Sequence, residues 1–400
     1  MNDSGGGVPF GGGSGLAIAI AASVTIVVVL PLFLVGALAV QVRAELGITV
    51  AGLGMVVAGY RAFTAVIAIR VGRLVDRLGA AHALRASAGL SALAMFGIAA
   101  QPRSWVGLSG WLLIAAVAFA FGQTSVNRFL SLVVPEGRRG LAFGLKQSSV
   151  PTATLVAGVA VPVIALTVGW RWAFVAAAIL GLIVMLLVPS ASSAHMENSA
   201  PGGVPGVAPP RRDAIMFAVA FGLAMTAASP LGVFLVDHAV QAGFGPGSAG
   251  LLLSLGSVAS IVSRLIVGRA ADRRTDGHLR GVALMVIVGV AGYLLLATGL
   301  RPLMVIGTVL AFAFGWGFNG LFWFAVLRAH PASPAAITGQ VMLGSTFGGL
   351  IGPLAFGFVA DVWSYRTAWI MASFSAIAAA VTMMACDRMV ARTSGTQPPS

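Results

Sequence analysis

Long apolar runs separated by short polar stretches are the dominant pattern along the 400 residues. About 20 apolar residues in a helix span the hydrocarbon core of a bilayer, because the core is about 30 Å thick and each helical residue rises about 1.5 Å. Membrane β-strands would be about ten residues long and alternate in polarity, so these runs predict helices. We predict twelve spans, at 16–41, 49–71, 85–101, 105–133, 141–167, 171–189, 213–237, 248–268, 280–300, 302–328, 336–361 and 366–386.

One connection differs from the others, because residues 190–212 are rich in Pro, Gly and Ser and have no apolar period. Such a composition is typical of a disordered linker. We therefore expect two six-helix halves, 16–189 and 213–386, joined by a cytoplasmic linker at 190–212. Residues 1–15 are expected to be a disordered tail, and residues 387–400 a second short tail.

Short motifs recur in the two halves at a nearly constant offset, which indicates a duplicated unit. The segment 72–79, GRLVDRLG, follows the second span, and the similar segment 268–274, GRAADRR, follows the eighth span 196 positions later (268 − 72 = 196). Both segments are predicted to be short charged turns. Fainter matches keep the same order, at 51–53 and 249–251 (AGL), 119–122 and 312–315 (FAFG), and 169–174 and 364–369 (GWRWAF and SYRTAW).

The composition excludes a soluble enzyme. Hydrophobic residues make up 58% and charged residues 9% of the chain, whereas soluble domains carry about 25% charged residues. The net charge is +13, but the arginines lie between apolar runs and form no basic face, so no nucleic-acid partner is expected. A single cysteine, Cys386, and five histidines in predicted connections without ligand spacing predict no metal site. No nucleophile–base pair or phosphate loop indicates an enzyme or a cofactor.

Basic residues gather on one side of the predicted membrane protein. With both termini inside, sixteen of the 24 Lys and Arg residues fall at cytoplasmic ends and loops. Five fall outside: Arg43, Arg103, Arg171, Arg301 and Arg366. Because cytoplasmic loops carry an excess of Lys and Arg, we expect a multi-pass protein of the cell membrane with both termini in the cytoplasm.

The twelve spans, the two related halves, the central linker and the segment 72–79 together resemble the major facilitator superfamily of secondary transporters. The likeness extends from the first to the twelfth span. The basic loop 135–140, PEGRRG, and the glycine-rich stretch 348–361, GGLIGPLAFGFVAD, are similar to segments common in that superfamily. The resemblance implies an all-α membrane protein of two pseudo-symmetric six-helix bundles. It also implies a monomeric carrier of a small molecule that works by alternating access.

The repeated motif supplies the residues of a predicted cytoplasmic gate: Gly72, Asp76, Arg77, Gly268, Asp272 and Arg273. The two glycines would let a neighbouring helix approach closely. The resemblance places the first Asp near the start of the eleventh span and the second near the start of the fifth. The positive end of a helix there would stabilise a carboxylate by about 0.3–1 kcal/mol. The arginines would pair with loop acids such as Glu136, and the gate would close while the carrier faces outward. The alternative is that these charges only set the topology.

Three further basic residues, Arg61, Arg128 and Arg264, fall within predicted spans, and Lys146, the only lysine and one of the sixteen above, lies six residues into the fifth span. Charges inside a membrane are costly and usually face a cavity. Arg61 lies eleven residues before Gly72, about 16 Å by helical rise, and therefore near the bilayer centre. For Arg128 and Lys146, which lie close to the inner face, snorkelling towards the headgroups explains the position equally well.

The predicted substrate-binding set is Arg61, Arg264, Arg128, Gln123, Asn127, Lys146, Trp316 and Asn319. The two amides of the fourth span lie one turn apart, and Asn127 could share a site with Arg128 or with Lys146. The tenth span is dense in aromatic residues, which suits an apolar or aromatic carboxylate, although packing is the alternative for its phenylalanines.

The sign of the charges predicts the substrate class. No acidic residue occupies the middle of a span, and the nearest acids fall at run ends: Asp76, Asp237, Asp272 and Asp361. A cavity with cations and no fixed anion attracts anions, and arginine binds a carboxylate bidentately. The spacing Arg264–Gly268–Asp272 is similar to the eighth helix of monocarboxylate and oxalate-type carriers of the superfamily, where that arginine meets the carboxylate. We therefore expect a small organic anion, moved with protons or by exchange.

Two other functions are open. A drug or metabolite:proton antiporter is the first, although Ala118 stands where exporters carry an arginine, and residues 149–152, SVPT, replace their GPxxG signature. A non-transporting membrane receptor is the second, although a receptor would normally append a soluble domain. The coupling proton has no obvious carrier, since Asp237, the nearest candidate, is expected to be solvated at an outer end.

Overall fold

A computed structural model describes residues 12–101, 103–134, 136–188, 210–273, 277–330 and 333–394. Twelve helical spans in this part of the chain are long and apolar enough to cross a membrane, as predicted. The helices are α1 (Gly12–Ala37), α2 (Ala39–Leu46), α3 (Val50–Leu78), α4 (Ala80–Ala100), α5 (Trp105–Val133), α6 (Glu136–Ala160), α7 (Trp170–Leu187), α8 (Arg211–Ala228), α9 (Leu231–Gln241), α10 (Pro246–Asp272), α11 (His278–Ala297), α12 (Arg301–Leu310), α13 (Asn319–Ala329), α14 (Pro334–Val362) and α15 (Tyr365–Ser394). Two π-helical segments, η1 (Val161–Ala165) and η2 (Ala311–Trp316), continue the fifth and tenth spans.

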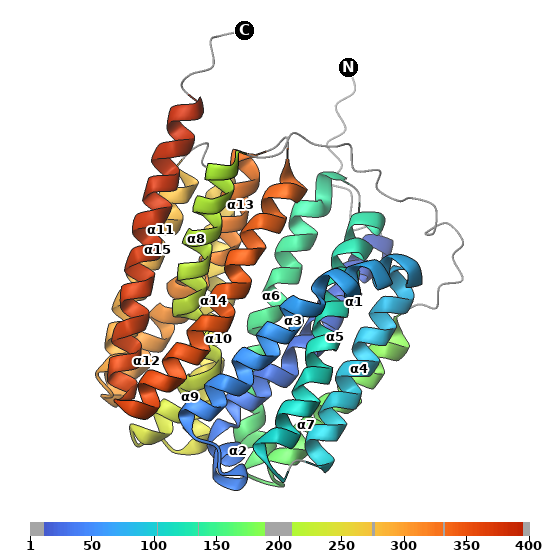
Figure 1. The fold of residues 1–400 in the computed structure, drawn as a ribbon, viewed down its shortest axis with the longest axis vertical. Helices are drawn as coiled ribbons and strands as arrows, with labels where there is room; N and C mark the ends of the chain where they lie inside the picture. The colour runs from blue at the N-terminus through green and yellow to red at the C-terminus, as the bar shows by residue number, and fades with distance from the viewer. Residues whose placement is uncertain are drawn as a thin grey trace.

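The spans form two six-helix bundles that stand side by side, the N half (α1–α7) and the C half (α8–α15) (Figure 1). The first helix begins and the last helix ends at the same end of the molecule, which we call the terminal end. The opposite end, which we call the far end, carries α2 and the connection from α14 to α15 (Figure 1). Most of the predicted linker, 189–209, lies outside the described residues, and α8 begins two residues before the predicted seventh span.

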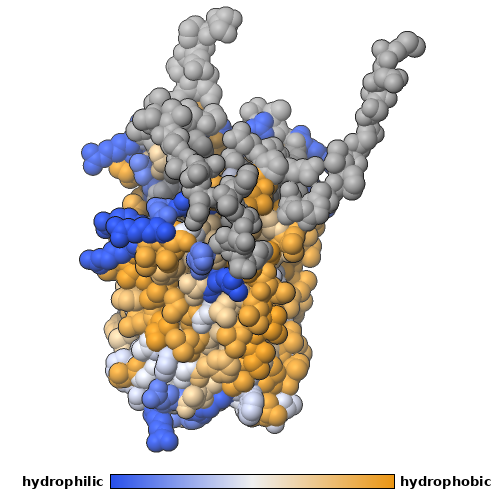
Figure 2. Space-filling model, turned by 90° about the vertical axis from the view of Figure 1, so that its right-hand side faces the viewer, coloured by the Kyte–Doolittle hydropathy of each residue, from blue (hydrophilic) through white to orange (hydrophobic). Residues whose placement is uncertain are grey.

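Apolar side chains cover the outside of the bundle as well as its interior. Figure 2 shows hydrophobic residues across the middle of one face and hydrophilic residues towards the two ends. Residues such as Ile69 and Leu186 are 74% and 69% exposed, a degree that suits contact with acyl chains rather than water. This zone of exposed apolar side chains is therefore what a protein that spans the membrane requires.

The segment 72–79 is not the predicted turn. It forms the last two turns of α3, which ends only at Gly79, a residue with a positive φ of 78°. No proline interrupts the helix before Gly79, and 29 residues make α3 about 43 Å long. The helix therefore extends beyond the hydrocarbon core and carries its charged residues into the polar surface layer. The second copy of the motif, at 268–274, is also largely helical, because α10 continues to Asp272.

The two halves meet closely at the far end through glycines. A methyl group added at Gly36 of α1 would lie 2.3 Å from the carbonyl oxygen of Gly232 in α9, and one at Gly158 of α6 would lie 2.5 Å from that of Gly250 in α10. A third helix pair, α3 and α14, is equally close, because a methyl group at Gly54 of α3 would lie 2.6 Å from the carbonyl oxygen of Pro353 in α14. Backbones this close leave no room for a side chain, so the far end is closed.

Candidate functional site

A cavity of about 150 Å³ lies between the two halves. Both deep arginines of the predicted set face it, as do Gln123, Trp316 and Asn319. Several other residues that shape it were not indicated by the sequence, among them Val29, Phe33, Tyr60, Phe119, Gln147, Ser229, Ser345 and Gly349. Because α1, α3 and α5 contribute from one half and α10, α13 and α14 from the other, relative movement of the halves would change the shape of the cavity.

Arg61 lies among aromatic rings without an acidic partner. Its guanidinium carbon is 5.9 Å from the ring centre of Tyr60 and 5.7 Å from that of Phe119. Its Nε is buried and has no hydrogen-bond partner, and in the described part of the chain no carboxylate lies within 4 Å of it. In the described part of the chain the ring faces stabilise the charge, by about 0.5–2 kcal/mol each, and the Nε leaves part of the hydrogen-bonding capacity unused.

Arg264 connects the halves through backbone carbonyl groups. Its guanidinium donates to the carbonyl oxygen of Gln147 in α6 at 2.8 Å and to that of Trp316 in η2 at 3.3 Å. The amide of Asn319 donates to the same Trp316 oxygen at 3.1 Å. The wide π-helical turn of η2, closed by a bond from the amide of Gly317 to the carbonyl of Phe312, leaves that oxygen available. The Nε of Arg264 is buried without a partner.

Lys146 forms a buried cluster with the two amides of α5. Its ammonium donates to Oε1 of Gln123 at 2.7 Å and to Oδ1 of Asn127 at 2.9 Å. Lys146 is only 5% exposed, so it does not snorkel towards the surface. Of the two partners considered for Asn127, the structure therefore brings it to Lys146. Gln123 belongs to both the cluster and the cavity wall, so it links the two.

Arg128 lies outside the cavity. Its guanidinium forms an ion pair with the carboxylate of Asp76 on α3, and it is not among the described residues that line the cavity. The sequence placed Arg128 with the substrate-binding residues because depth along a helix does not reveal which neighbour a side chain faces. The pair lies within the N half, so in this conformation Asp76 also contacts its own bundle rather than the opposite one.

The predicted cytoplasmic gate is separated in this structure. No atom lies within 4 Å of a methyl group added at Gly72 or at Gly268, and Arg77 and Arg273 are exposed. The side chains of Asp272 and Glu136 lie outside the described residues. The two halves therefore do not meet at these positions, and the gate itself stays a prediction for the opposite conformation.

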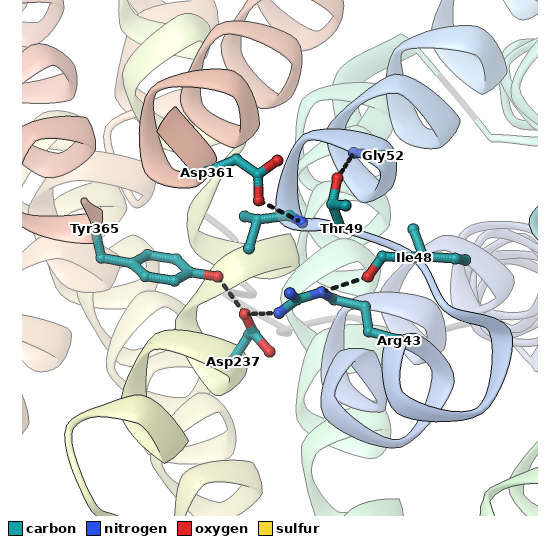
Figure 3. A network of polar contacts seen from close by, with 8 residues as sticks. Arg43, Ile48, Thr49, Gly52, Asp237, Asp361 and Tyr365 are labelled. Atoms are coloured by element: carbon teal, nitrogen blue, oxygen red, sulfur yellow. Dashed lines mark hydrogen bonds and ion pairs between the residues drawn. The ribbon is translucent and has the colours of Figure 1, made fainter. Parts of the chain in front are cut away.

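The far end carries a polar network that joins the halves (Figure 3). Asp237 of α9 accepts hydrogen bonds from the guanidinium of Arg43 in α2 and from the hydroxyl of Tyr365 in α15. Asp361 at the end of α14 accepts from the backbone amide of Val50 at 3.2 Å. Arg43 also donates to the carbonyl oxygen of Ile48 at 3.1 Å (Figure 3). Both acids thus bind groups of the N half across the interface.

Two expectations about this region are wrong. Asp237 is 4% exposed rather than solvated, because Arg43 and Tyr365 enclose it. His238 is not in a connection but in α9, where its Nδ1 accepts from the indole of Trp369 at 3.0 Å and its ring stacks on Tyr365 at 4.8 Å. The contacts join residues 128 or more positions apart, so no local pattern reveals them.

A sequence model described as Major Facilitator Superfamily matches residues 13–342. The chain belongs to the major facilitator superfamily. This superfamily member is similar to Monocarboxylate transporter 11 of Mus musculus, with 29% identity over 63% of this chain and 58% of that protein. It is also similar to Monocarboxylate transporter 11 of Homo sapiens, with 27% identity over 67% of this chain and 58% of that protein. The chain thus spans about 58% of the length of these curated relatives.

Solved structures of the superfamily share the fold of this transporter at low identity. The nucleoside transporter NupG matches with a TM-score of 0.71 and 16% identity, over 93% of this chain and 98% of NupG. A bacterial homologue of the human lysosomal transporter Spinster, in an inward-facing and occupied conformation, matches with a TM-score of 0.69 and 13% identity, over 96% of this chain and 98% of that one. The all-α architecture of twelve spans in two bundles is confirmed, and the chain is a multi-pass membrane protein of the superfamily.

Proposed function

We propose that this transporter moves a small organic anion, a monocarboxylate, by alternating access, and that Arg61 and Arg264 bind its carboxylate. The observation that carries the proposal is the pair of half-buried arginines, each with a buried Nε, in one cavity with no acid beside them in the described residues. A buried cation without a counter-charge is costly. A bound carboxylate would supply that counter-charge and would accept the hydrogen bonds that the two Nε groups do not make.

The rest of the cavity suits an apolar or aromatic body on the substrate. Phe33, Tyr60, Phe119 and Trp316 contribute ring faces, while Gln123 and Asn319 supply a few polar groups. A cavity of about 150 Å³ fits a small molecule rather than a long chain. The names of the curated relatives, monocarboxylate transporters, point to the same substrate class.

The proposed transport cycle follows from the closed far end. In the proposed cycle this structure is the state in which the cavity communicates with the terminal end, and both termini are proposed to lie in the cytoplasm of a cell-membrane protein that works as a monomer. In the opposite state the network of Arg43, Asp237 and Tyr365 separates, and the motif residues around Gly72 and Gly268 close the cytoplasmic side. Transport would be coupled to protons or proceed by exchange.

The alternative, a drug:proton antiporter, differs in the charge that its cavity accepts. Two fixed cations beside Gln123 and Asn319 disfavour an organic cation, because like charges repel at short range in a medium of low dielectric constant. Ligand charge therefore separates the two functions, and a receptor would bind its ligand without moving it.

A thermal-shift screen with three ligands of one shape tests the proposal. Benzoate, benzamide and benzylamine share the ring and differ in charge, and only a ligand of the native cavity stabilises the protein. We expect benzoate to raise the melting temperature of the wild type and of the Arg366→Gln control, which removes an exposed far-end arginine. Arg61→Gln and Arg264→Gln should lose the shift. Stabilisation by benzylamine but not by benzoate would reject an anion site.

A further inference from the structure

The buried groups around the cavity differ in whether they can exchange a proton. Arg61 and Arg264 cannot, because an arginine side chain is not deprotonated in proteins. Asp237 lies at the far end in an ion pair with Arg43, and Asp361 binds the amide of Val50 there. Apart from Tyr60, a phenol that ordinarily keeps its proton at neutral pH, Lys146 is the remaining described group that titrates and that contacts the cavity wall, through Gln123. It is also the only lysine of the chain.

The surroundings of Lys146 accept either charge state. Its two partners are side-chain amide oxygens, Oε1 of Gln123 at 2.7 Å and Oδ1 of Asn127 at 2.9 Å, and neither is an anion. An ammonium group has three N–H donors and a neutral amine has two. The two oxygens can therefore be satisfied before and after a proton leaves, so the transfer requires no rearrangement of the cluster. A carboxylate partner would instead have fixed the charged state.

The groups that face Lys146 from neighbouring elements carry no opposite charge. Helix α6 packs against α1 and η1, which have no titratable side chains, and against α5 and α10. From α10, Arg264 binds the carbonyl of the adjacent Gln147, and from α5, Arg128 is engaged by Asp76. Arg269 and Asp272 lie further along α10 at its terminal end, and the side chain of the latter is not described. Among the described residues of these elements, the uncompensated charge that binds next to Lys146 is therefore that of Arg264, and it is positive.

We propose that Lys146 is the proton-binding site through which this carrier couples to protons, an inference that rests on the proposed transport of a carboxylate. Beside this positive charge, an incoming anion favours the protonated lysine, and a protonated lysine favours the anion. Such linkage is reciprocal, so substrate and proton bind together and leave together. Gln123 transmits the effect of protonation at Lys146 to the anion site, because it contacts both the lysine and the cavity.

The single lysine allows a direct test that needs no substrate. The full chain is labelled with ¹³C-lysine and placed in lipid nanodiscs, where its side-chain NMR signal comes from one residue only. We expect the signal to change charge state across the pH range in which transport operates, and benzoate to shift the titration towards the protonated form. A signal that stays in the protonated position throughout that range overturns the proposal.

Flux measurements with two variants test the coupling. Lys146→Arg keeps a permanent charge and Lys146→Gln removes it, so neither can exchange the proton. In proteoliposomes we expect both variants to lose accumulation driven by a pH gradient by a larger factor than they lose benzoate counterflow, which needs no net proton movement. Accumulation by Lys146→Arg within about twofold of the wild type would contradict the role of this residue, since a twofold change is below about 0.5 kcal/mol.

Together, the NMR titration and the flux measurements distinguish a failure of this inference from a failure of the proposed function. If the wild type moves no carboxylate, the proposed function fails, while the lysine signal still decides whether Lys146 binds a proton. If the wild type exchanges benzoate but its lysine does not titrate, the carboxylate site stands and the proton site is rejected. A variant that does not fold is recognised by the loss of its monodisperse elution and is replaced by the NMR titration of the wild type.

Discussion

At the scale of residues, the two cavity arginines are held in different ways. Arg61 is surrounded by ring faces, which hold a cation without occupying its N–H groups, so its guanidinium can turn to a ligand. Arg264 is fixed by carbonyl groups from both halves, on Gln147 and Trp316. We therefore expect Arg61 to decide affinity, and Arg264 to combine affinity with the contact between the halves.

Arg61→Lys separates charge from geometry. A lysine keeps the positive charge but lacks the planar fork that binds a carboxylate with two hydrogen bonds. We expect the dissociation constant for benzoate to rise about tenfold, which corresponds to about 1.4 kcal/mol, and Arg61→Gln to weaken binding further. Titration calorimetry measures both values. Equal affinity of Arg61→Lys and the wild type would show that the fork does not hold the substrate.

Glu45 of α2 gives a pH-dependent contribution outside the membrane spans. Hydrogen bonds from the Trp170 indole, at 2.6 Å, and from the Arg171 guanidinium lower the pKa of the Glu45 carboxyl below its ordinary value of 4.5. A lowered carboxyl pKa stabilises the folded protein above the ordinary value, and this stabilisation is lost as the pH falls through the folded-state pKa. Glu45→Gln should therefore lower the melting temperature at pH 7, and the difference from the wild type should shrink below pH 4.5. A difference that does not change with pH would contradict this account.

Much of the site could be predicted at this scale, because a basic residue in a span is costly unless it faces a cavity. Arg61, Arg264 and Gln123 line the cavity as that reasoning expects. The pair of Arg43 and Asp237 was missed, because its members lie near span ends and are 194 positions apart. From the sequence alone, a polar residue near the end of a span is expected to be solvated, because its partner on another element is not known.

At the scale of elements, hydrophobic runs gave the number and order of the spans but not their ends. The apolar run of the second span stops near 71, whereas α3 continues to Leu78, since Arg and Asp residues can remain helical in the polar surface layer. The π-helical segment η2 was not predicted either. Its residues, AFAFGW, form an ordinary apolar stretch, and the wide turn that exposes the Trp316 carbonyl depends on packing against other helices.

Gly54 and Gly59 provide a matched pair on one helix. A methyl group at Gly54 would lie 2.6 Å from the Pro353 carbonyl oxygen on α14, whereas one at Gly59 meets no atom within 4 Å. We expect Gly54→Ala to destabilise the far-end-closed state by about 1–3 kcal/mol, the usual cost of overpacking, and to lower the melting temperature. Gly59→Ala should be neutral or slightly stabilising, because alanine favours a helix. Equal melting temperatures of the two variants would contradict the close crossing.

At the scale of the whole molecule, the halves touch at one end and separate at the other. Glycine crossings and the network around Asp237 join them at the far end, whereas a methyl group added at Gly72 or at Gly268, at the terminal end, would meet no atom within 4 Å. The pseudo-symmetry of the repeated motif could be predicted from the sequence. The conformation could not, because two arrangements of the same helices satisfy one pattern of apolar residues.

Asp237→Asn tests the far-end closure. The substitution removes the anion that Arg43 binds and leaves a partly buried cation without its partner, so the closed state becomes less stable. We expect spin labels at residues 103 and 366, placed in a variant without the native Cys386, to show a larger share of long distances than in the Asp237 protein. Identical distance distributions would show that the ion pair does not control closure.

Two arginines in a cavity between the halves are proposed to carry a carboxylate across the membrane. Counterflow of radiolabelled benzoate in proteoliposomes measures this movement without a driving gradient. The account predicts exchange by the wild type and by Arg366→Gln, and none by Arg61→Gln or Arg264→Gln. Benzoate exchange at the wild-type rate by both cavity variants would contradict it.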